Sequence, residues 1–272
     1  MKNTPDRSAS HRRRFLSPGE IVFFVLGTLL ILFIVAPVIR MIVTTPPSDL
    51  AETAREREVI VSVFLTLRAA FWATLLGLAG GVPLAYLLAR RNFPGRALVE
   101  ALVDIPVIIP HSAAGIALLA MYGRHTFLGK FFGFFGIGFL DSELGIVLAM
   151  AFVSVPFLVN TAKEGFRLIP ERLERVARTL GASPWQVFWH VSLPLCKRAI
   201  GAGAILMWAR GISEFGAVLI LAYNPKITPV LLYERFEQFG LRYAAPVATL
   251  LILVCLALFF LFRFLSRRKR HD

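Results

Sequence analysis

The sequence has little cysteine: Cys196 and Cys255 are the two in 272 residues. They lie far apart and belong to no CxxC or Cys/His cluster, so we expect neither a disulfide framework nor a metal site. The sequence also lacks GxxxxGK[ST], the pattern that cradles nucleotide phosphates, and it lacks HExxH or any other nucleophile–base pair. We therefore expect no enzyme, no cofactor and no ATP site in this chain, and any ATP hydrolysis would belong to a partner subunit.

Acidic residues are also scarce, because 17 Asp and Glu stand against 30 Lys and Arg, for a net charge of +13. A basic chain can bind nucleic acid, associate with anionic lipid or carry a membrane-topology signal. The basic residues here flank long apolar segments and form no continuous face or aromatic-interleaved groove. We therefore expect a topology signal and no nucleic-acid partner.

Long apolar runs are what the sequence does contain, with 57% hydrophobic residues and a mean hydropathy of +0.68. A membrane helix needs about 20 apolar residues to cross the hydrocarbon core. Six stretches are long enough, and they cover residues 21–43, 59–89, 98–122, 144–160, 199–222 and 244–265. The sequence thus predicts an all-α membrane protein with six transmembrane helices. The second stretch exceeds one crossing, so it must tilt, kink or begin along the surface, and Gly80-Gly81 followed by Pro83 is the place where a break is expected.

The distribution of Lys and Arg predicts the orientation. The two tails and the loops 90–97 and 163–198 carry twenty, whereas the alternate loops carry seven. This difference places both termini in the cytoplasm of a multi-pass protein of the cytoplasmic (inner) cell membrane. The expected organisation is a basic tail (1–20), a first transmembrane helix (21–43), a five-helix core (59–265) containing the loop 163–198, and a C-terminal tail (266–272).

The loop 163–198 is long and has clear helix signals. Pro170 suits a first helical position, and Glu171 and Glu174 then fall in the first turn, where the helix dipole favours acids. Gly181 follows as the residue that ends the helix in a left-handed conformation. The apolar residues between them recur at helical spacing on one face: Leu173, Val176, Ala177 and Leu180.

A second short helix is predicted after Gly181. Ser183-Pro184-Trp185-Gln186 has the pattern of a capping box with proline at the first helical position, and Pro194 is expected to end the helix near Ser192. The hairpin therefore carries exposed apolar and aromatic residues. Such a patch usually marks a protein partner, but packing on the protein's own inner face or in the lipid interface is an equal alternative on pattern alone.

The end of this loop resembles the EAA loop of ABC-importer permeases. Ala177, then Gly181, nine residues, Val191, one residue and Leu193-Pro194 match the motif's spacing, although its usual Glu-Ala pair is Arg175-Val176 here, with an acid at Glu174. The resemblance implies a coupling helix that docks in a cleft of the ATP-binding subunit. The implied coupling residues are Glu174, Ala177, Gly181, Ala182, Trp185, Phe188, Val191, Leu193 and Pro194.

The fifth stretch carries Arg210 and Glu214 at i, i+4 near mid-membrane, where ionisable groups usually face a cavity or a partner. They could line a translocation path, neutralise each other, or lock two helices together. Residues 213–241 resemble molybdate/tungstate permeases, and sulfate permeases share their Glu-Phe-Gly core. The expected path residues are Pro106, Pro110, Arg210, Ser213, Glu214, Phe215 and Gly216.

Other polar groups in the apolar stretches have simpler interpretations. His111 has no second ligand at helical spacing, so a hydrogen-bonded structural role is favoured over metal binding. Glu100 and Asp104 are expected to pair with loop arginines. Arg68 could favour an anion path or merely balance a carboxylate.

The resemblance implies a MetI-like type I ABC-importer permease. Its expected partners are a second copy of the chain, two ATP-binding subunits, an extracytoplasmic oxyanion-binding protein and the lipid bilayer. The implied substrate is tungstate or molybdate, and the pore residues do not identify which. Alternatives are a sulfate or thiosulfate permease of the same architecture, or a secondary transporter or channel that needs no ATPase.

Overall fold

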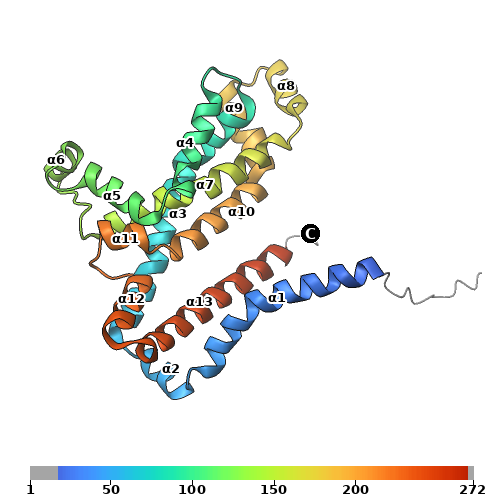
Figure 1. Ribbon diagram of the computed structural model, residues 1–272. Coiled ribbons are helices and arrows are strands. Elements are labelled where there is room, and N and C mark those ends of the chain that lie inside the picture. Colours follow the sequence, from blue (N-terminus) through green and yellow to red (C-terminus); the bar gives the residue numbers. More distant parts are fainter. Residues whose placement is uncertain (1–17, 269–272) are drawn as a thin grey trace, which may run out of the picture. The chain divides into compact units, whose positions relative to one another are not determined.

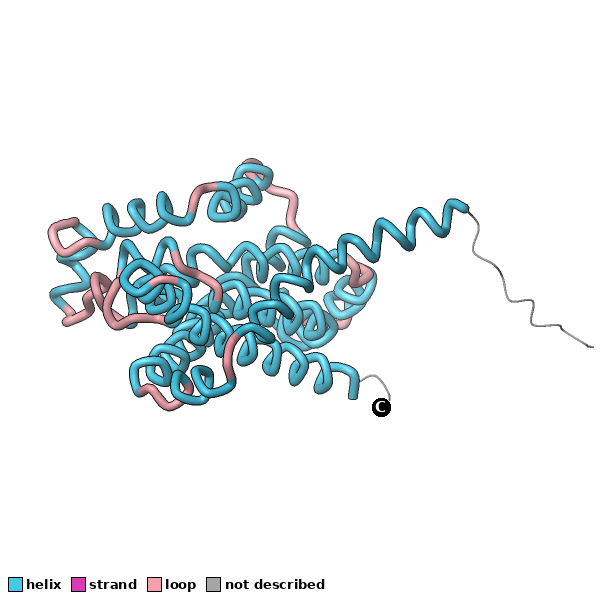
Figure 2. Tube along the Cα trace, turned by 60° about the horizontal axis from the view of Figure 1, so that its bottom comes forward, coloured by secondary structure: helices cyan, strands magenta, loops and turns pink. Residues whose placement is uncertain are grey.

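The computed structural model describes residues 18–268, and these form helices and loops without any strand (Figures 1 and 2). The chain divides into two compact units, Met1–Pro46 and Pro47–Asp272. The all-α class expected from the apolar stretches is therefore confirmed. Most of the predicted N-terminal tail and the last residues of the C-terminal tail lie outside the described part.

The first unit contains one described helix, α1 (Pro18–Thr44), which includes the first predicted span. Apolar side chains are exposed all around it, among them Phe23 and Phe33, and its most apolar window has no buried residue. A helix that is hydrophobic on every side suits a lipid environment. We expect α1 to cross the membrane.

Three long helices form the core of the second unit: α3 (Arg57–Arg90), α7 (Glu143–Arg167) and α10 (Leu193–Ile212). They pack against one another, as Figure 1 shows. Small residues allow the backbones to approach, as is usual for helices in membranes. A Cβ on Gly203 of α10 would meet Leu158 and Thr161 of α7 at 3.2 Å.

The break expected near Gly80-Gly81 and Pro83 is wrong, because α3 is one continuous helix of 34 residues. The structure gives Gly81 a different role. A Cβ there would meet the Val159 side chain of α7 at 3.1 Å, so this glycine permits close helix packing. Pro83 is accommodated inside the helix.

The third predicted span, by contrast, is not one straight helix. It consists of α4 (Arg96–Ile108) and α5 (His111–Tyr122), bent by 113° at the break. Pro110 cannot donate a backbone hydrogen bond, and it forces the preceding residue Ile109 into an extended conformation (φ −74°, ψ 146°). The described residues thus contain five helices long and apolar enough to span a membrane, or six if the bent pair counts as one span.

The fifth predicted span is also interrupted. The helix α10 ends at Ile212, and α11 (Gly216–Leu221) begins after a short break. The two helices that follow the breaks, α5 and α11, pack together, and a Cβ on Gly115 would meet the Ala217 backbone at 3.0 Å. Both interruptions therefore meet at one place in the second unit.

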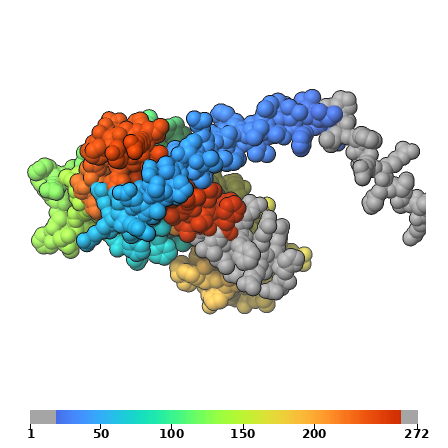
Figure 3. Space-filling view, turned by 90° about the horizontal axis from the view of Figure 1, so that it is seen from below, coloured from blue at the N-terminus to red at the C-terminus, as the bar shows by residue number. Residues whose placement is uncertain are grey.

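Shorter helices and the last span complete this unit: α2 (Pro47–Thr53), α6 (Phe127–Phe134), α12 (Thr228–Phe239) and α13 (Leu241–Arg268). In the space-filling view the light-green region around α6 lies at an edge (Figure 3). Phe127 and Phe134 of α6 are more than four-fifths exposed. Such exposed rings suit an interfacial position for this Phe- and Gly-rich segment.

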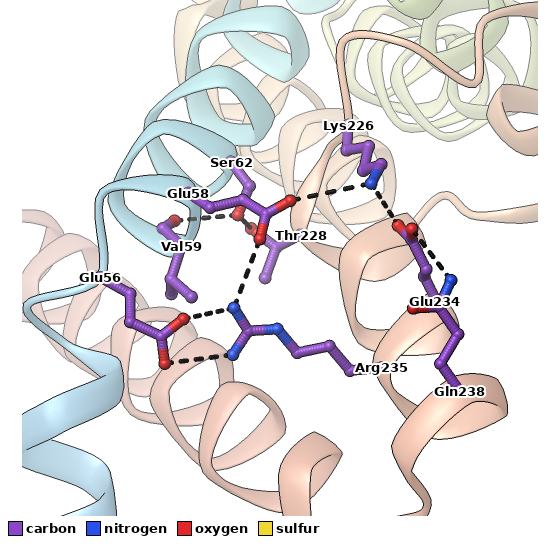
Figure 4. A network of polar contacts seen from close by, with 9 residues as sticks. All are labelled: Glu56, Glu58, Val59, Ser62, Lys226, Thr228, Glu234, Arg235 and Gln238. Carbon is purple, nitrogen blue, oxygen red and sulfur yellow. Dashed lines mark hydrogen bonds and ion pairs between the residues drawn. The ribbon is translucent and has the colours of Figure 1, made fainter.

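An ion-pair network holds α12 against the beginning of α3 (Figure 4). Arg235 of α12 pairs with Glu56 and Glu58, and Lys226 pairs with Glu58 at 3.7 Å and with Glu234 at 2.5 Å. The carboxylate of Glu234 raises the pKa of Lys226. Arg235 pairs with both carboxylates at the beginning of α3, so it is a direct link from α12 to that helix.

Replacing Arg235 by glutamine should lower the free energy of unfolding by about 1–2 kcal/mol, because Glu56 and Glu58 then repel each other without a cation between them. The midpoint of thermal unfolding in detergent measures the effect. Arg242→Gln is the matched control, since Arg242 is exposed and forms no ion pair among the described residues. Equal midpoints for the two variants would contradict the structural role of the network.

Candidate coupling hairpin and translocation path

The loop after α7 forms the predicted helical hairpin. Its first helix is α8 (Glu171–Thr179), and its second begins as α9 (Pro184–Val187). Between them, Gly181 has a φ of 91°, and the Ala182 amide donates to the Ala177 carbonyl at 3.1 Å. This is the glycine-based helix end expected from the sequence, and the capping box of Ser183 and Gln186 is present as well.

The second helix does not end at Pro194, which corrects the sequence prediction. A π-helical turn, η1 (Phe188–Ser192), follows α9 and leads directly into α10. The Leu193 amide bonds to the Phe188 carbonyl across this wide turn, and Pro194 then occupies the first turn of α10, where no amide donor is needed. Residues Pro184–Ile212 therefore form one helix of 29 residues.

Glu174 is the anchor of the hairpin inside the protein. Its side chain is buried, and its carboxylate accepts hydrogen bonds from Arg90 Nε at 2.7 Å, Ser192 Oγ at 2.8 Å and the Tyr86 hydroxyl at 3.3 Å. The Arg90 guanidinium is buried too, and it also donates to the Ile169 carbonyl at 2.9 Å. Paired, hydrogen-bonded charges of this kind are held in a fixed geometry.

This network joins α8, η1 and the end of α3. The sequence resemblance implied that Glu174 is one of the coupling residues. In the structure its side chain points into the protein, away from the exposed surface of the hairpin. The sequence interpretation missed Arg90, Tyr86 and Ser192. In the sequence, Arg90 was one of the basic residues from which the orientation was predicted, and no contact with Glu174 was expected.

The other predicted coupling residues divide into an inner and an outer group. Phe188 is 7% exposed, and its ring lies 4.9 Å from the ring of Tyr86. Trp185 is 69% exposed. Gly181 and Pro194 are also exposed, whereas the remaining members are half-buried: Ala177, Ala182, Val191 and Leu193.

A second cluster lies where the two helix breaks meet. Glu214 is fully buried, and its carboxylate is 3.0 Å from the Arg210 guanidinium and 2.8 Å from Nδ1 of His111. Its other oxygen accepts the Ala217 amide of α11 at 3.0 Å. The Arg210 guanidinium also lies 2.7 Å from His111 Nδ1. Arg210 and Glu214 therefore neutralise each other and link α10 and α11 to α5.

The rest of the predicted path set surrounds this cluster. A Cβ on Gly216 would meet His111 at 3.0 Å, so a glycine is needed for this approach. Ser213 is exposed and accepts a hydrogen bond from Arg210 at 3.3 Å. The Phe215 ring packs on Tyr233, while the two prolines differ: Pro106 is buried in α4 and Pro110 is exposed at the bend.

Three further charged residues of the predicted spans have partners outside the two clusters around Glu174 and Glu214. Glu100 pairs with Arg96, Lys163 and Arg167, as expected, and Arg68 pairs with Glu143 at 2.5 Å. Among the described residues, Asp104 forms no ion pair with a loop arginine; Asn160 of α7 donates to it at 2.7 Å instead. The prediction for Asp104 is therefore wrong. The side chain that satisfies it comes from a neighbouring span that sequence spacing could not place.

Comparison with known proteins identifies the family to which the chain belongs. Residues 81–271 match the family model described as "Binding-protein-dependent transport system inner membrane component". The molybdate/tungstate transport system permease protein WtpB of Thermococcus kodakarensis is 44% identical over 251 residues, covering 91% of this chain and 96% of the relative. The sulfate transport system permease protein CysT of Escherichia coli is 32% identical over 257 residues, covering 93% and 92%.

A solved bacterial alginate ABC transporter, in complex with a periplasmic protein carrying an alginate pentasaccharide, has a chain with the same fold. Its TM-score is 0.71 at 18% identity, over 91% of this chain and 94% of that one. The family match covers well over half of the sequence. The chain is therefore a multi-pass cell-membrane protein of the binding-protein-dependent transport family, an ABC-importer permease subunit.

Proposed function

We propose that the protein is the membrane-spanning subunit of an ATP-driven importer of molybdate or tungstate. The observation that carries this proposal is the hairpin, which is built into α3 and α10 on its inner side and exposes apolar side chains on its outer side. The 44% identity to a molybdate/tungstate permease supports the substrate class. The assembly would contain two copies of this chain, two ATP-binding subunits that hydrolyse ATP, and an extracytoplasmic protein that delivers the anion.

In the proposed mechanism, ATP-driven closure of the partner subunits moves the hairpin. The Glu174–Arg90 pair passes this movement to α3, and the continuous helix Pro184–Ile212 passes it to the break before α11. The cluster at that break would open and close a gate formed by the third and fifth spans. Both termini and the hairpin would lie in the cytoplasm.

Gly181→Pro tests the coupling role. Proline cannot adopt a φ of 91°, so the hairpin should lose its turn and uptake should fall to background. Gly181→Asn is the matched control, because asparagine tolerates the left-handed region and should keep most of the activity. Membrane insertion of both variants is checked on immunoblots of membrane fractions. Uptake by the proline variant at the wild-type rate would contradict the proposal.

A competition assay tests the substrate. Cells or vesicles containing the complete importer are supplied with molybdate, tungstate and sulfate together, and molybdenum, tungsten and sulfur uptake are measured. We expect the two metal oxyanions to enter in preference to sulfate. Preferential sulfate uptake would favour the sulfate permease. Uptake by separate vesicles that contain this chain without the ATP-binding subunit would favour a secondary transporter.

A further inference from the structure

A groove runs between α4 and α7, which pack along each other in the second unit (Figure 1). It has a volume of about 420 Å³, and most of its lining is apolar, including Val107 and Ile108 of α4. Its polar members are Asp104 of α4 together with Asn160 and Thr161 of α7. The mechanism proposed above gives none of these polar residues a role.

The polar residues of the groove lie deep within both helices. Asp104 follows the first residue of α4, Arg96, by eight positions, and Asn160 precedes the last residue of α7, Arg167, by seven. At 1.5 Å per residue these separations are about 12 Å and about 10 Å. The two helix ends lie together, because Arg167 pairs with Glu100 of α4 at 3.3 Å. The groove thus reaches from this end to a depth where a carboxylate facing lipid is costly.

Asp104 has no counter-charge at this depth. Its carboxylate accepts a hydrogen bond from the Asn160 amide at 2.7 Å, and it forms no ion pair within the described part of the chain. The Thr161 hydroxyl donates to the Phe157 carbonyl of its own helix at 2.7 Å. Because Asp104 is half-exposed and no cation balances it, its carboxylate needs contact with water. The groove is therefore wet, and its polar wall is negative.

The mouth of the groove, at the paired helix ends, has the opposite charge. Three cations surround Glu100: Arg96 at 3.1 Å, Lys163 at 3.5 Å and Arg167 at 3.3 Å. Arg167 also pairs with Glu164 at 2.7 Å. Three positive charges against two negative charges leave a net charge of +1. An anion inside the groove is thus repelled by the carboxylate at depth and attracted toward the mouth.

We propose that the groove between α4 and α7 is a water-filled exit for the transported oxyanion, and that Asp104 speeds release of the anion by charge repulsion. This inference rests on the proposed function, which places the mouth of the groove in the cytoplasm. A path for ions must bind its ion weakly enough for the ion to leave. A carboxylate beside the path has this effect on an anion, and it adds the fourth span to a path assigned to the third and fifth.

Thiol labelling tests whether the groove is wet. Inverted membrane vesicles present their cytoplasmic face to the medium, and the native cysteines are removed in the background C196S/C255S. Thr161→Cys should then react with water-soluble thiol reagents that do not cross membranes. Leu76→Cys is the matched control, because Leu76 of α3 is exposed but lies outside the groove, and it should stay unreactive.

Two methanethiosulfonate reagents of opposite charge measure the effect of Asp104. One carries a quaternary ammonium group and the other a sulfonate, and their rates with Thr161→Cys are divided by their rates with a free thiol. Asp104→Asn removes the charge but keeps an oxygen that can accept from Asn160. It should lower the ratio of the cationic to the anionic rate by about tenfold. A role in packing alone would not change this ratio.

Uptake by cells that contain the complete importer gives a second readout. Asp104→Asn should take up molybdate more slowly than the wild type, because the anion leaves the groove more slowly. A wild-type uptake rate for this variant, or an unchanged reagent ratio, would refute the role of Asp104 in release. Failure of Thr161→Cys to react would show that lipid or a second copy of the chain fills the groove, and the exit would be refuted.

The labelling separates this inference from the function on which it rests, because it requires no transport. Wild-type cells that take up neither molybdate nor tungstate would contradict the proposed function, whatever the labelling shows. Labelling of Thr161→Cys from the opposite face alone, in vesicles that are not inverted, would contradict the proposed orientation and with it the exit.

Discussion

Replacing Glu174 by glutamine should reduce ATP-driven uptake to background while the ATP-binding subunit stays bound. The amide keeps the shape of the side chain but cannot balance the buried charge of Arg90. Breaking a buried ion pair by removing one partner costs about 3–5 kcal/mol. The hairpin should therefore loosen from α3, whereas its exposed side chains, such as Leu173 and Trp185, are unchanged. ATP hydrolysis by the assembled complex should then continue without transport.

Glu237→Gln is the matched control for this experiment, because Glu237 of α12 is exposed and forms no ion pair among the described residues. It removes the same charge without touching the network, so uptake should stay near the wild-type rate. Wild-type uptake by the Glu174 variant would show that the network transmits no movement. Loss of the ATP-binding subunit from that variant would show instead that Glu174 merely shapes the docking surface.

The second large effect is expected at Glu214. Glutamine at this position leaves the Arg210 guanidinium among the spans without a full counter-charge, and it weakens the contact with His111. An unbalanced intramembrane charge is costly. We expect both a lower midpoint of thermal unfolding in detergent and the loss of uptake.

A double variant separates stability from transport at this site. The double variant R210M/E214L has neither charge. Exchanging a buried ion pair for apolar residues is often neutral or stabilising. The thermal midpoint should therefore return toward the wild-type value, while uptake stays low because the gate has lost its polar groups. Recovery of uptake together with stability would mean that the pair is structural and does not serve the path.

The parts of the structure governed by local rules could be predicted from the sequence. The capping box at Ser183 and the left-handed Gly181 follow from residues that are neighbours in the chain, and both are present. The prediction that Pro194 ends the helix was wrong. A proline in the first turn of a helix needs no amide donor, so Pro194 is accommodated at the beginning of α10. The bend before His111 was not predicted, because the residues on both sides of it are apolar. Hydropathy shows whether a segment is long enough to cross a membrane, but it does not show whether the segment is straight.

Contacts between distant residues could not be predicted. Arg90 and Glu174 are 84 positions apart, and His111 and Glu214 are 103 apart. Each appeared in the sequence as a single charged or polar group with several possible partners. The packing of the helices, such as α5 against α11 at the His111–Glu214 contact, selects the partner, and no spacing rule describes that packing.

The continuity of helix Pro184–Ile212 has a mechanical consequence. At 1.5 Å per residue its 29 residues form a rod about 40 Å long, with the docking aromatics at one end and Ser213 just beyond the other. The helix contains the π-helical turn Phe188–Ser192 but no break, so a tilt at one end displaces the other. Tilting it by about 10° displaces one end relative to the other by about 7 Å, a distance wider than a small tetrahedral anion. In the proposed mechanism, a modest tilt of the hairpin end would therefore move the Ser213 end by more than the width of the transported anion.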